Sequence, residues 1–347
     1  MQIKKYLWII ALAFLFLMCV FPNAVRSGAL SGIKACGNVI LPSVFPFAFF
    51  TLLFTNLGGA ALFSPFEKFS KKIFKMNKEQ LSVFVLSLIG GYPCGSKLIN
   101  EMAENGRISE ANASTMQCFC VSAGPAFIVL GAGCGVLGNK NVGYIMLAAH
   151  ITASLLLCAV FSVFLKPENS IAAPKKTASF AEAVTGAGEK SGAAVITMCI
   201  FVILFFTVNG IVNELFGNNH FVLFLSDLGE VTYGISSKNN IAVISFLIGF
   251  GGISVWLQIF ALSKSFNVKF SLFALSRILH GLISAMFSVL FCKIFDVDTG
   301  AFSANGKIFK IAFLNPFLCV CLFISIVVLI FELKNKNNSG NGKENVV

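Results

Sequence analysis

The chain alternates long apolar stretches with short polar turns over almost its whole length. Each stretch approaches or exceeds the roughly 20 residues that a helix needs to cross about 30 Å of hydrocarbon. Because lipid offers the backbone no hydrogen-bond partners, we predict an all-α polytopic membrane protein with about seven to nine membrane segments. The stretches lie at residues 6–25, 39–61, 81–103, 114–138, 142–165, 193–213, 241–263, 271–295 and 308–331.

The composition agrees with membrane insertion, and membrane insertion explains the high net positive charge. Hydrophobic residues make up 56% of the chain and charged residues only 12%. A net charge of +11 would suggest nucleic acid as the partner of a soluble protein, but here the lipid bilayer explains it. Several lysines share one short loop, which the positive-inside bias places in the cytoplasm. They are Lys68, Lys71, Lys72, Lys75 and Lys78.

The loop that carries these lysines has two interpretations. Phe66, Phe69, Ile73 and Phe74 recur among them at helical spacing. This pattern is typical of an amphipathic helix that lies on anionic lipid. A solvated basic loop is the alternative.

We expect the cysteines to be buried packing residues and not metal ligands. Most of the 11 fall inside apolar stretches, where Cys behaves as a small buried hydrophobe. Cys118 and Cys120 are two residues apart, as are Cys319 and Cys321, and no Cys-x-x-Cys occurs. We therefore expect no metal site and no cofactor.

Polar and glycine-rich segments divide the chain into two halves. Gly32–Phe54 resembles Gly186–Phe206 in its spaced glycines, its charged residue and its Phe-rich end, and each is followed by a glycine-broken stretch and a basic turn. Lys4 and Lys5 precede a first helix that lacks a good cleavage signal, so we expect it to be retained. The predicted division is an N-terminal membrane helix at 1–27, a first repeat at 28–165, a linker at 166–190, a second repeat at 191–331 and a polar tail at 332–347.

The relative orientation of the repeats depends on the stretch at 81–103. If it crosses the membrane the repeats are parallel, and if it is a re-entrant hairpin they are inverted. The hairpin keeps the loop at 62–80, Arg107 and the linker in the cytoplasm, which the positive-inside bias favours. The tail lysines oppose it, because they would lie outside. We predict two inverted repeats, each with a glycine-broken segment able to fold as such a hairpin.

The two glycine-broken segments carry the candidate site. Interrupted helices are tolerated at membrane depth only where protein or a watered cavity satisfies the freed backbone groups, and matched breaks indicate a transporter-like binding site. A helix restarting after the first break would point its free N–H groups at an anionic or hydrogen-bond-accepting solute. The predicted solute-binding residues are Gly91, Pro93, Cys94, Gly95, Ser96, Lys97, Gly252, Ser254 and Gln258.

Further polar positions lie in apolar surroundings. Arg277 and His280 are three residues apart on one helical face and could couple a proton to movement; a structural pair facing a carbonyl is the alternative. Lys97 could instead snorkel to the interface. The break at Ser122–Pro125 is either functional or a bend, and we interpret His150 as structural. No nucleophile–base constellation is evident, so we do not expect an enzyme.

The segments 90–99 (GGYPCGSKLI), 105–109 (NGRIS) and 122–128 (SAGPAFI) resemble the YlbJ-like sporulation integral membrane proteins of the nucleoside-recognition, or Gate-domain, family. The resemblance covers about residues 28–331. It implies a multi-pass protein in the cytoplasmic membrane of an endospore-forming bacterium, with duplicated Gate domains. Gate domains are similar to parts of nucleoside transporters and of ferrous-iron permeases, in which a cysteine follows a glycine-rich break as Cys94 does here.

Together these observations predict a transporter-like membrane protein that binds or moves a small polar solute, nucleoside-like or anionic, at the interface of two repeats. A non-transporting scaffold or accessory subunit that contacts other sporulation membrane proteins is one alternative. A metal-ion permease that uses Cys94 is another.

Overall fold

A computed structural model describes residues 7–168, 179–217, 219–236 and 238–297. Every regular element within these ranges is a helix, which confirms the all-α prediction. Five stretches are long and apolar enough to cross a membrane, so the protein is polytopic. They are Pro22–Asn56, Lys140–Phe164, Phe180–Phe216, Ile241–Leu262 and Phe270–Ile294. The predicted segment at 308–331 and the tail at 332–347 lie outside the described residues.

The N-terminal helices pack against the longest helix of the structure. After α1 (Leu7–Val20), the elements α2 (Pro22–Ala35), η2 (Cys36–Ile40) and α3 (Leu41–Asn56) form one continuous span that lies against α9 (Phe180–Phe216). A Cβ atom on Gly28 would lie 2.6 Å from the Phe206 carbonyl oxygen, and one on Gly210 would lie 2.7 Å from the Ala24 carbonyl oxygen. Small residues let the two backbones approach this closely.

Two predicted boundaries differ from the observed ones. The helix expected at 39–61 already starts at Pro22, because no residue between 22 and 40 breaks the backbone ladder. The segment expected as a linker, 166–190, contains the start of α9. Ser179 and Glu182 form a capping box there, since each side chain accepts a hydrogen bond from the backbone N–H of the other, and such a box fixes a helix start.

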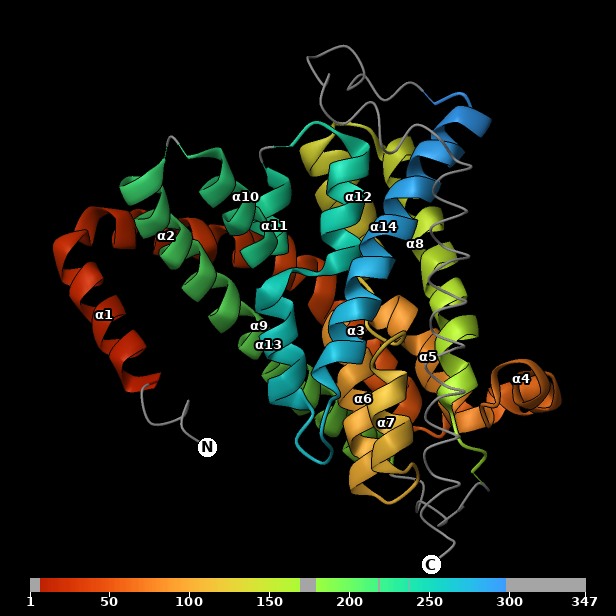
Figure 1. Cartoon of the computed structure of the whole chain (residues 1–347). Coiled ribbons are helices and arrows are strands. Elements are labelled where there is room, and N and C mark those ends of the chain that lie inside the picture. Colours follow the sequence, from red (N-terminus) through yellow and green to blue (C-terminus); the bar gives the residue numbers. More distant parts are fainter. Residues whose placement is uncertain (1–6, 169–178, 218, 237, 298–347) are drawn as a thin grey trace, which may run out of the picture.

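A short amphipathic helix follows α3. Between η3 (Gly59–Phe66) and α5, helix α4 (Glu67–Phe74) projects from the bundle (Figure 1). Phe69 is 60% exposed and Ile73 is 50% exposed, and Lys71 forms an ion pair of 2.9 Å with Glu67. The hydrogen bond from Lys71 holds the pKa of Glu67 below its ordinary value. The segment is therefore helical, as the amphipathic interpretation expects, and its position on anionic lipid stays a prediction.

The first glycine-broken segment is a hairpin. Asn77 caps α5 (Lys78–Gly90), and α6 (Tyr92–Glu104) returns beside it. Arg107, just after α6, forms an ion pair of 3.5 Å with Glu79 at the start of α5. The hairpin therefore begins and ends at the same end of the molecule.

The next two elements complete the first half. Between α7 (Glu110–Met116) and η4 (Phe127–Val136) the backbone is irregular from residue 117 to residue 124. Helix α8 (Lys140–Phe161) with η5 (Ser162–Phe164) then returns to the end of the molecule where the hairpin opens. The Lys75 ammonium donates a hydrogen bond of 3.1 Å to the Val163 carbonyl there.

The second half contains a pair of helices that the apolar pattern did not predict. Helix α10 (His220–Gly229) is followed after one residue by α11 (Val231–Ser236), which folds back so that a Cβ atom on Gly234 would lie 2.4 Å from the Asp227 carbonyl oxygen. Asp227 also forms an ion pair with Lys238 beyond the end of α11.

The second glycine-broken segment is a span and not a hairpin, which corrects the prediction. Helices α12 (Ile241–Phe250) and α13 (Gly252–Leu262) follow each other along α14 (Phe270–Ile294). The Ser245 hydroxyl donates to that of Ser288 at 2.8 Å, and farther along the Trp256 ring lies 5.6 Å from that of Phe273. Because successive parts of this segment meet successive parts of α14, it runs the length of the bundle.

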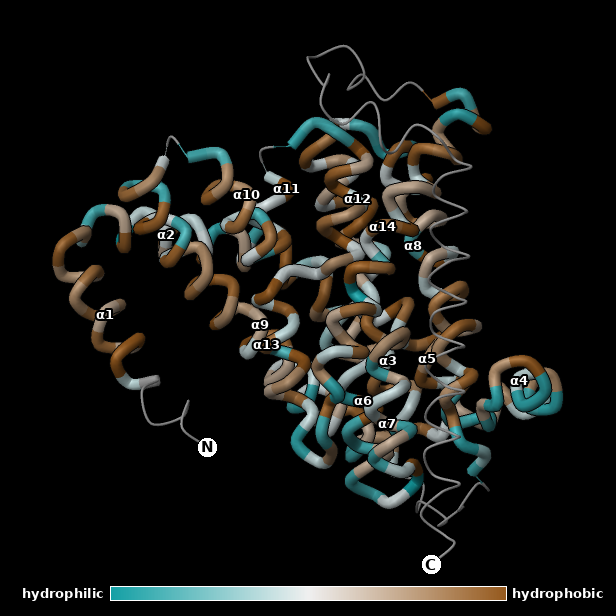
Figure 2. Tube along the Cα trace, in the orientation of Figure 1, coloured by the Kyte–Doolittle hydropathy of each residue, from teal (hydrophilic) through white to brown (hydrophobic). Residues whose placement is uncertain are grey.

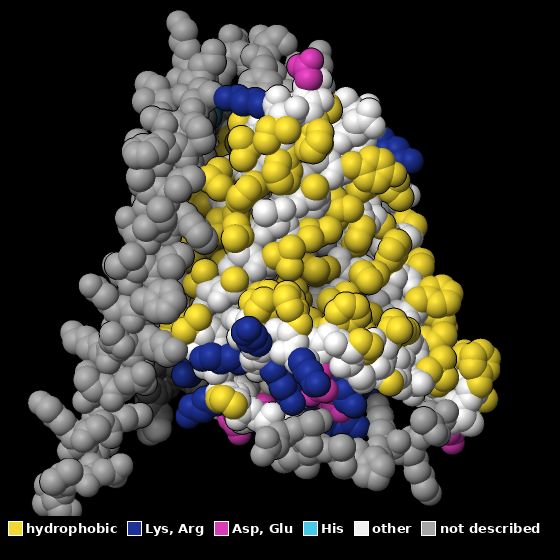
Figure 3. Space-filling view, turned by 90° about the vertical axis from the view of Figure 1, so that its right-hand side faces the viewer, with side chains coloured by type: hydrophobic (Ala, Val, Ile, Leu, Met, Phe, Trp, Pro, Cys, Tyr) yellow, Lys and Arg dark blue, Asp and Glu magenta, His cyan; other side chains and the backbone are white. Residues whose placement is uncertain are grey.

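Polar residues gather at the two ends of the bundle and apolar residues between them (Figure 2). The space-filling view shows most of the visible Lys and Arg side chains gathered at the lower end of this face, with apolar side chains across its middle and a few charged ones at its upper end (Figure 3). Ion pairs and hydrogen bonds connect the chain segments at this basic end: Arg107 with Glu79, Lys190 with Glu101, and Glu168 with Gln80. The positive-inside bias predicts that this end faces the cytoplasm.

Reporters inserted into the full chain after Lys166 and after Gly138 test this orientation. We expect the first to be cytoplasmic and the second external, because α8 carries the chain from one end to the other. A third insertion after Asn105, at the open end of the hairpin, serves as the control and should match Lys166. Finding Asn105 and Lys166 on opposite sides would contradict the hairpin arrangement.

Candidate functional site

The first chain break is the tip of the α5–α6 hairpin. Gly91 has φ of +82°, which favours glycine, and its N–H donates to the Ser87 carbonyl at 3.3 Å. Pro93 stands in the first turn of α6, where the missing N–H costs nothing. A Cβ atom on Gly90 would lie 2.6 Å from Cys94 Sγ, so Cys94 fills the inside of the turn.

Two other breaks meet this tip. A Cβ atom on Gly91 would lie 3.2 Å from the backbone N of Gly124, in the irregular segment between α7 and η4. The Tyr92 hydroxyl donates a hydrogen bond to the Ile248 carbonyl at the end of α12. The Tyr92 ring also lies 3.6 Å from where a Cβ atom of Gly251 would be. The sequence predicted the breaks at Gly91 and Gly251 as partners, and the structure places them in contact through Tyr92.

A fourth break joins the other three. Gly252 has φ of +75°, and a Cβ atom on it would lie 3.0 Å from the backbone N of Val231 and 3.3 Å from the Cα of Glu230. The tip of the α10–α11 hairpin therefore abuts the interruption between α12 and α13. We call the four junctions together the break cluster; it consists of Gly91, Gly124, Glu230 and Gly251 with their immediate neighbours.

The predicted residue Ser96 belongs to a buried chain of hydrogen bonds. Its hydroxyl donates to the Gln117 side-chain oxygen at 3.0 Å, and the Gln117 amide donates to the Ser263 hydroxyl at 2.9 Å. A Cβ atom on Gly95 would lie 2.0 Å from the Cys120 carbonyl oxygen, so α6 touches the backbone of the irregular segment. These contacts hold α6 in place.

The polar residues after the second break are paired with each other. The Gln258 amide donates to the Ser254 hydroxyl at 3.2 Å, and both side chains are buried. Helix α13, which carries them, packs against α6. Lys97 is half-buried and forms no ion pair or hydrogen bond with another described residue.

Arg277 compensates the backbone of the interrupted first-half helix. Its guanidinium is fully buried and donates to the Cys118 carbonyl at 2.7 Å and to the Val121 carbonyl. Both carbonyls lie where α7 has ended and no helical N–H is available. The forked donors of arginine suit two neighbouring acceptors. This is the arrangement that the structural interpretation of Arg277 predicts.

His280 continues the same polar layer. Its Nδ1 lies 3.2 Å from the Arg277 Nη1, and its ring stacks on that of His150 with 4.3 Å between the ring centres. The His150 Nε2 accepts a hydrogen bond of 3.0 Å from the backbone N–H of Ala123. His150, which we interpreted as structural, therefore also supports the irregular segment.

Glu230 is the functional candidate that the sequence interpretation missed. It is 1% exposed, and its carboxylate accepts a hydrogen bond of 2.6 Å from the backbone N–H of Tyr233. In the described part of the chain it forms no ion pair. An ionisable residue at membrane depth is a signal that could have found it, but the apolar run around it is too short to read as a membrane segment.

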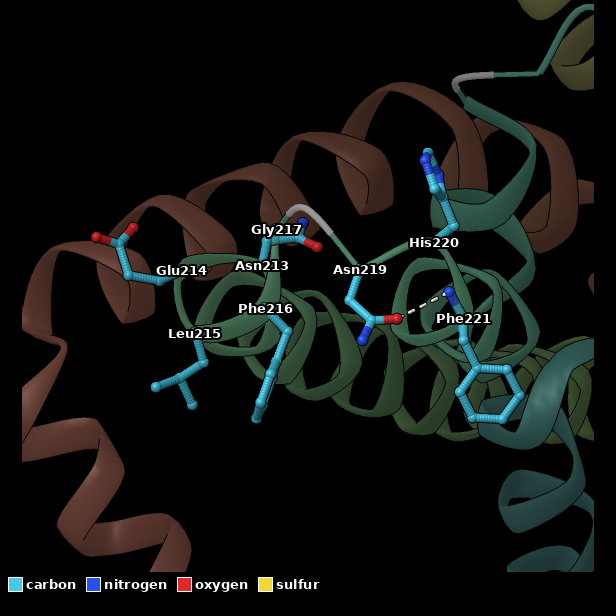
Figure 4. Close-up of a pocket in the computed structure, with 8 residues that line it drawn as sticks. All are labelled: Asn213, Glu214, Leu215, Phe216, Gly217, Asn219, His220 and Phe221. Carbon is cyan, nitrogen blue, oxygen red and sulfur yellow. Dashed lines mark hydrogen bonds between the residues drawn. The ribbon is translucent and has the colours of Figure 1, made fainter.

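A hollow of about 800 Å³ opens at the turn between α9 and α10, away from the basic end (Figure 4). Asn213 lines it and donates a side-chain hydrogen bond to the Tyr233 hydroxyl. The Asn213 Oδ1 atom is buried and finds no partner among the described residues. The hollow is thus connected by one polar side chain to the helix that follows Glu230.

A second hollow, of about 230 Å³, lies at the basic end where the α5–α6 hairpin opens. Lys78, Glu79 and Arg107 are among the residues that line it. Neither hollow is lined by the residues of the predicted solute site, which are buried except for the half-buried Lys97.

The chain is similar to the sporulation integral membrane protein YlbJ of Bacillus subtilis (strain 168). The two are 24% identical over 403 aligned residues, which cover 96% of this chain and 98% of the relative. No protein-family profile matches the chain, and no solved structure does. The chain is YlbJ-like, and with five apolar spans among its described residues it is a multi-pass membrane protein of a bacterium. The likeness to the nucleoside-recognition group stays a prediction.

Proposed function

We propose that this YlbJ-like membrane protein is a non-enzymatic transporter that moves a small anionic or otherwise polar solute past the break cluster and takes part in spore formation. The observation that carries the proposal is the meeting of the breaks at Gly91 and Gly251 through Tyr92. Broken helices that converge at membrane depth are the usual construction of a transporter site. The role in sporulation rests on the similarity to YlbJ.

The charge at the cluster supports an anion as the preferred solute. Helices α6 and α13 both begin there, at Tyr92 and at Gly252, and helix N-termini favour negative charge. Arg277 adds a full positive charge, buried beside the same segments. A neutral solute such as a nucleoside would use the hydrogen-bonding groups alone, so it stays the second choice.

The order of elements supports two inverted repeats, offset from the correspondence first predicted. Each half has a long span, a hairpin, a broken span and a further span. They are α2–α3, α5–α6, α7–η4 and α8 in the first half, and α9, α10–α11, α12–α13 and α14 in the second. In this pairing the tip at Gly91 corresponds to Glu230, and Gly124 corresponds to Gly251. The first hairpin opens at the basic end and the second at the other end, as inversion requires (Figure 1).

Lys97→Ala and Ser254→Ala test the predicted site. We expect each to abolish both solute uptake into proteoliposomes and rescue of spore formation in a Bacillus subtilis strain that lacks YlbJ. Lys97 is a cation in the second turn of α6, and the Ser254 hydroxyl accepts a hydrogen bond from the Gln258 amide. Uptake would be measured with labelled succinate, phosphate and uridine, which separate anionic from neutral solutes.

Matched controls exist for both variants. Lys264 and Ser271 are exposed near the basic end, so Lys264→Ala and Ser271→Ala should keep wild-type behaviour. Membrane insertion of all four variants is checked by extraction and gel filtration. Wild-type uptake by both Lys97→Ala and Ser254→Ala would reject the site.

A scaffold role has one observation in its favour, the exposed and basic helix α4. If it is correct, replacing the lysines of α4 by glutamate should impair sporulation more than the changes at residues 97 and 254. A metal permease has less support. Cys94 is 2% exposed, and the described residues contain no group of three or more His, Cys, Asp or Glu side chains able to hold a metal ion.

A further inference from the structure

Three formally charged side chains are buried within the described residues: Asp227, Glu230 and Arg277. Asp227 has Lys238 as its ion-pair partner. Arg277 is satisfied by two backbone carbonyls. Glu230 alone of the three is an anion without a cation in contact. A buried charge in this position normally binds a proton or a counter-ion, because leaving it bare in apolar surroundings costs several kcal/mol.

The surroundings of Glu230 contain one influence that favours each of its charge states. The Tyr233 N–H, in the first turn of α11, favours the carboxylate. The nearly complete burial of the side chain favours the neutral acid. A carboxyl group balanced in this way gains and loses a proton with small changes in its surroundings.

Several other titratable groups lie near Glu230, and we expect Glu230 to be the one among them that accepts a proton. Tyr92 lies within electrostatic reach of both Glu230 and Arg277 and donates its own proton to Ile248. Cys36 is also within electrostatic reach. Tyr233 accepts from Asn213, and the hollow near that end of α9 is lined by Glu214 and His220. The titratable and charged groups that face Glu230 or its approach are Cys36, Tyr92, Glu214, His220, Asp227, Tyr233, Lys238 and Arg277.

The hollow at the α9–α10 turn supplies an approach from water. Asn213 lines the hollow, bonds the Tyr233 hydroxyl and keeps a buried oxygen without a partner. Tyr233 in turn bonds the Glu230 carboxylate through its backbone N–H. Asn213 and Tyr233 therefore lie between the hollow and the Glu230 carboxylate.

We propose that Glu230 is a proton-binding site, and that the proton it carries accompanies an anionic solute past the break cluster. When Glu230 is ionised, the region holds one buried negative and one buried positive charge, Glu230 and Arg277, both within electrostatic reach of Tyr92. Protonation removes the negative charge and leaves Arg277 as the full charge, so the cluster then attracts an anion. Proton and anion favour each other's binding, as linked ligands must. The movement of the proton together with an anion rests on the proposed transport function, whereas proton binding at Glu230 does not.

Infrared difference spectroscopy of the full-length protein in lipid nanodiscs tests the proton site without any solute. Between about pH 6 and about pH 9 exposed Glu side chains are already ionised, so a carboxylic acid C=O band lost across this range reports a buried acid. We expect wild-type protein to lose such a band. Glu230→Gln should lack it, and Glu230→Asp should keep a band that is shifted in frequency.

Glu189→Gln is the matched control, because it makes the same substitution at an exposed position of α9 that lines neither hollow, and it should behave as wild type. A titrating band that persists in Glu230→Gln would overturn the assignment. If Glu230→Gln fails to fold, the assignment is tested with the wild type and Glu230→Asp. The absence of a titrating band in the wild type would overturn the assignment, and so would an unshifted band in Glu230→Asp.

Proteoliposomes that contain a pH-sensitive dye test the coupling separately. Adding succinate or phosphate outside should acidify the interior with wild-type and Glu189→Gln protein, and this acidification should be lost with Glu230→Gln. Anion uptake by the wild type without proton movement would overturn the coupling. If the wild type moves neither succinate, phosphate nor uridine, that result counts against the transport proposal, and the infrared result still stands for Glu230.

Discussion

Replacing Arg277 with methionine is expected to prevent the protein from reaching a stable fold. The substitution keeps a long side chain but leaves the carbonyls of Cys118 and Val121 buried without donors. Each unsatisfied buried group costs about 1–3 kcal/mol, so the pair costs about 2–6 kcal/mol, a large part of the stability of an ordinary domain. His280, which lies 3.2 Å from the guanidinium, would lose a neighbour as well.

The measurement is the yield of monodisperse protein in detergent and its apparent unfolding temperature. Arg277→Lys should be intermediate, because an ammonium keeps the charge but lacks the fork that reaches both carbonyls. Arg107→Met is the control: Arg107 pairs with Glu79 at the partly exposed basic end, where an ion pair contributes about 0–1 kcal/mol. An Arg277→Met protein as stable as Arg107→Met would show that the buried carbonyls find other partners.

Gly95→Ala is expected to have the second largest effect on stability. The added methyl would lie 2.0 Å from the Cys120 carbonyl oxygen and 2.8 Å from the Ser87 Cβ. Because the first of these is backbone of the irregular segment, no rotamer change relieves the overlap, and α6 must move. Overpacking of this kind costs about 1–3 kcal/mol or more.

Gly192→Ala provides the comparison for Gly95→Ala. Gly192 lies inside α9, and nothing is within 4 Å of the position that its Cβ would take. Alanine there should leave stability unchanged or raise it by about 0.5–1 kcal/mol, because glycine is the poorer helix former. Both proteins would be compared by thermal unfolding monitored through tryptophan fluorescence, for which Trp256 beside α14 is a native probe. Equal stability of the two variants would contradict the close packing of α6 against Cys120.

The first broken hairpin could be predicted from the sequence because local chemistry decides it. Glycines at 90 and 91 followed by Pro93 end one helix and start another, and the lysine-rich loop and Arg107 keep both ends on one side. The same reasoning did not distinguish hairpin from span at Gly251. There the outcome depends on contacts between distant segments: α12 packs along α14, and the Trp256 ring of α13 reaches that of Phe273 at the start of α14. No local residue pattern encodes those contacts.

The α10–α11 hairpin escaped prediction for a different reason. Its helices have 10 and 6 residues, so neither reaches the length of a membrane span, and Asp227 and Glu230 interrupt the apolar run. A hairpin needs only half the length of a span in each arm. The start of α9 at Phe180 was not predicted either, because the residues that cap it are polar and were assigned to the linker.

The role of Arg277 at the irregular segment could be listed as an alternative but not chosen from sequence. Its partners lie more than 150 residues away along the chain. That separation also explains why Ser96, Gln117 and Ser263 could not be recognised as one hydrogen-bonded chain. Contacts between distant segments depend on packing, whereas the breaks themselves depend on glycine and proline.

The buried carboxylate and the buried guanidinium at the break cluster also determine how the membrane voltage affects transport. A single proton carried on Glu230 with a monoanion moves no net charge, so the membrane voltage would neither drive nor oppose the step. A dianion with the same proton moves one negative charge, and each 100 mV then contributes about 2.3 kcal/mol. The voltage dependence of uptake therefore reports the charge of the solute that the cluster accepts.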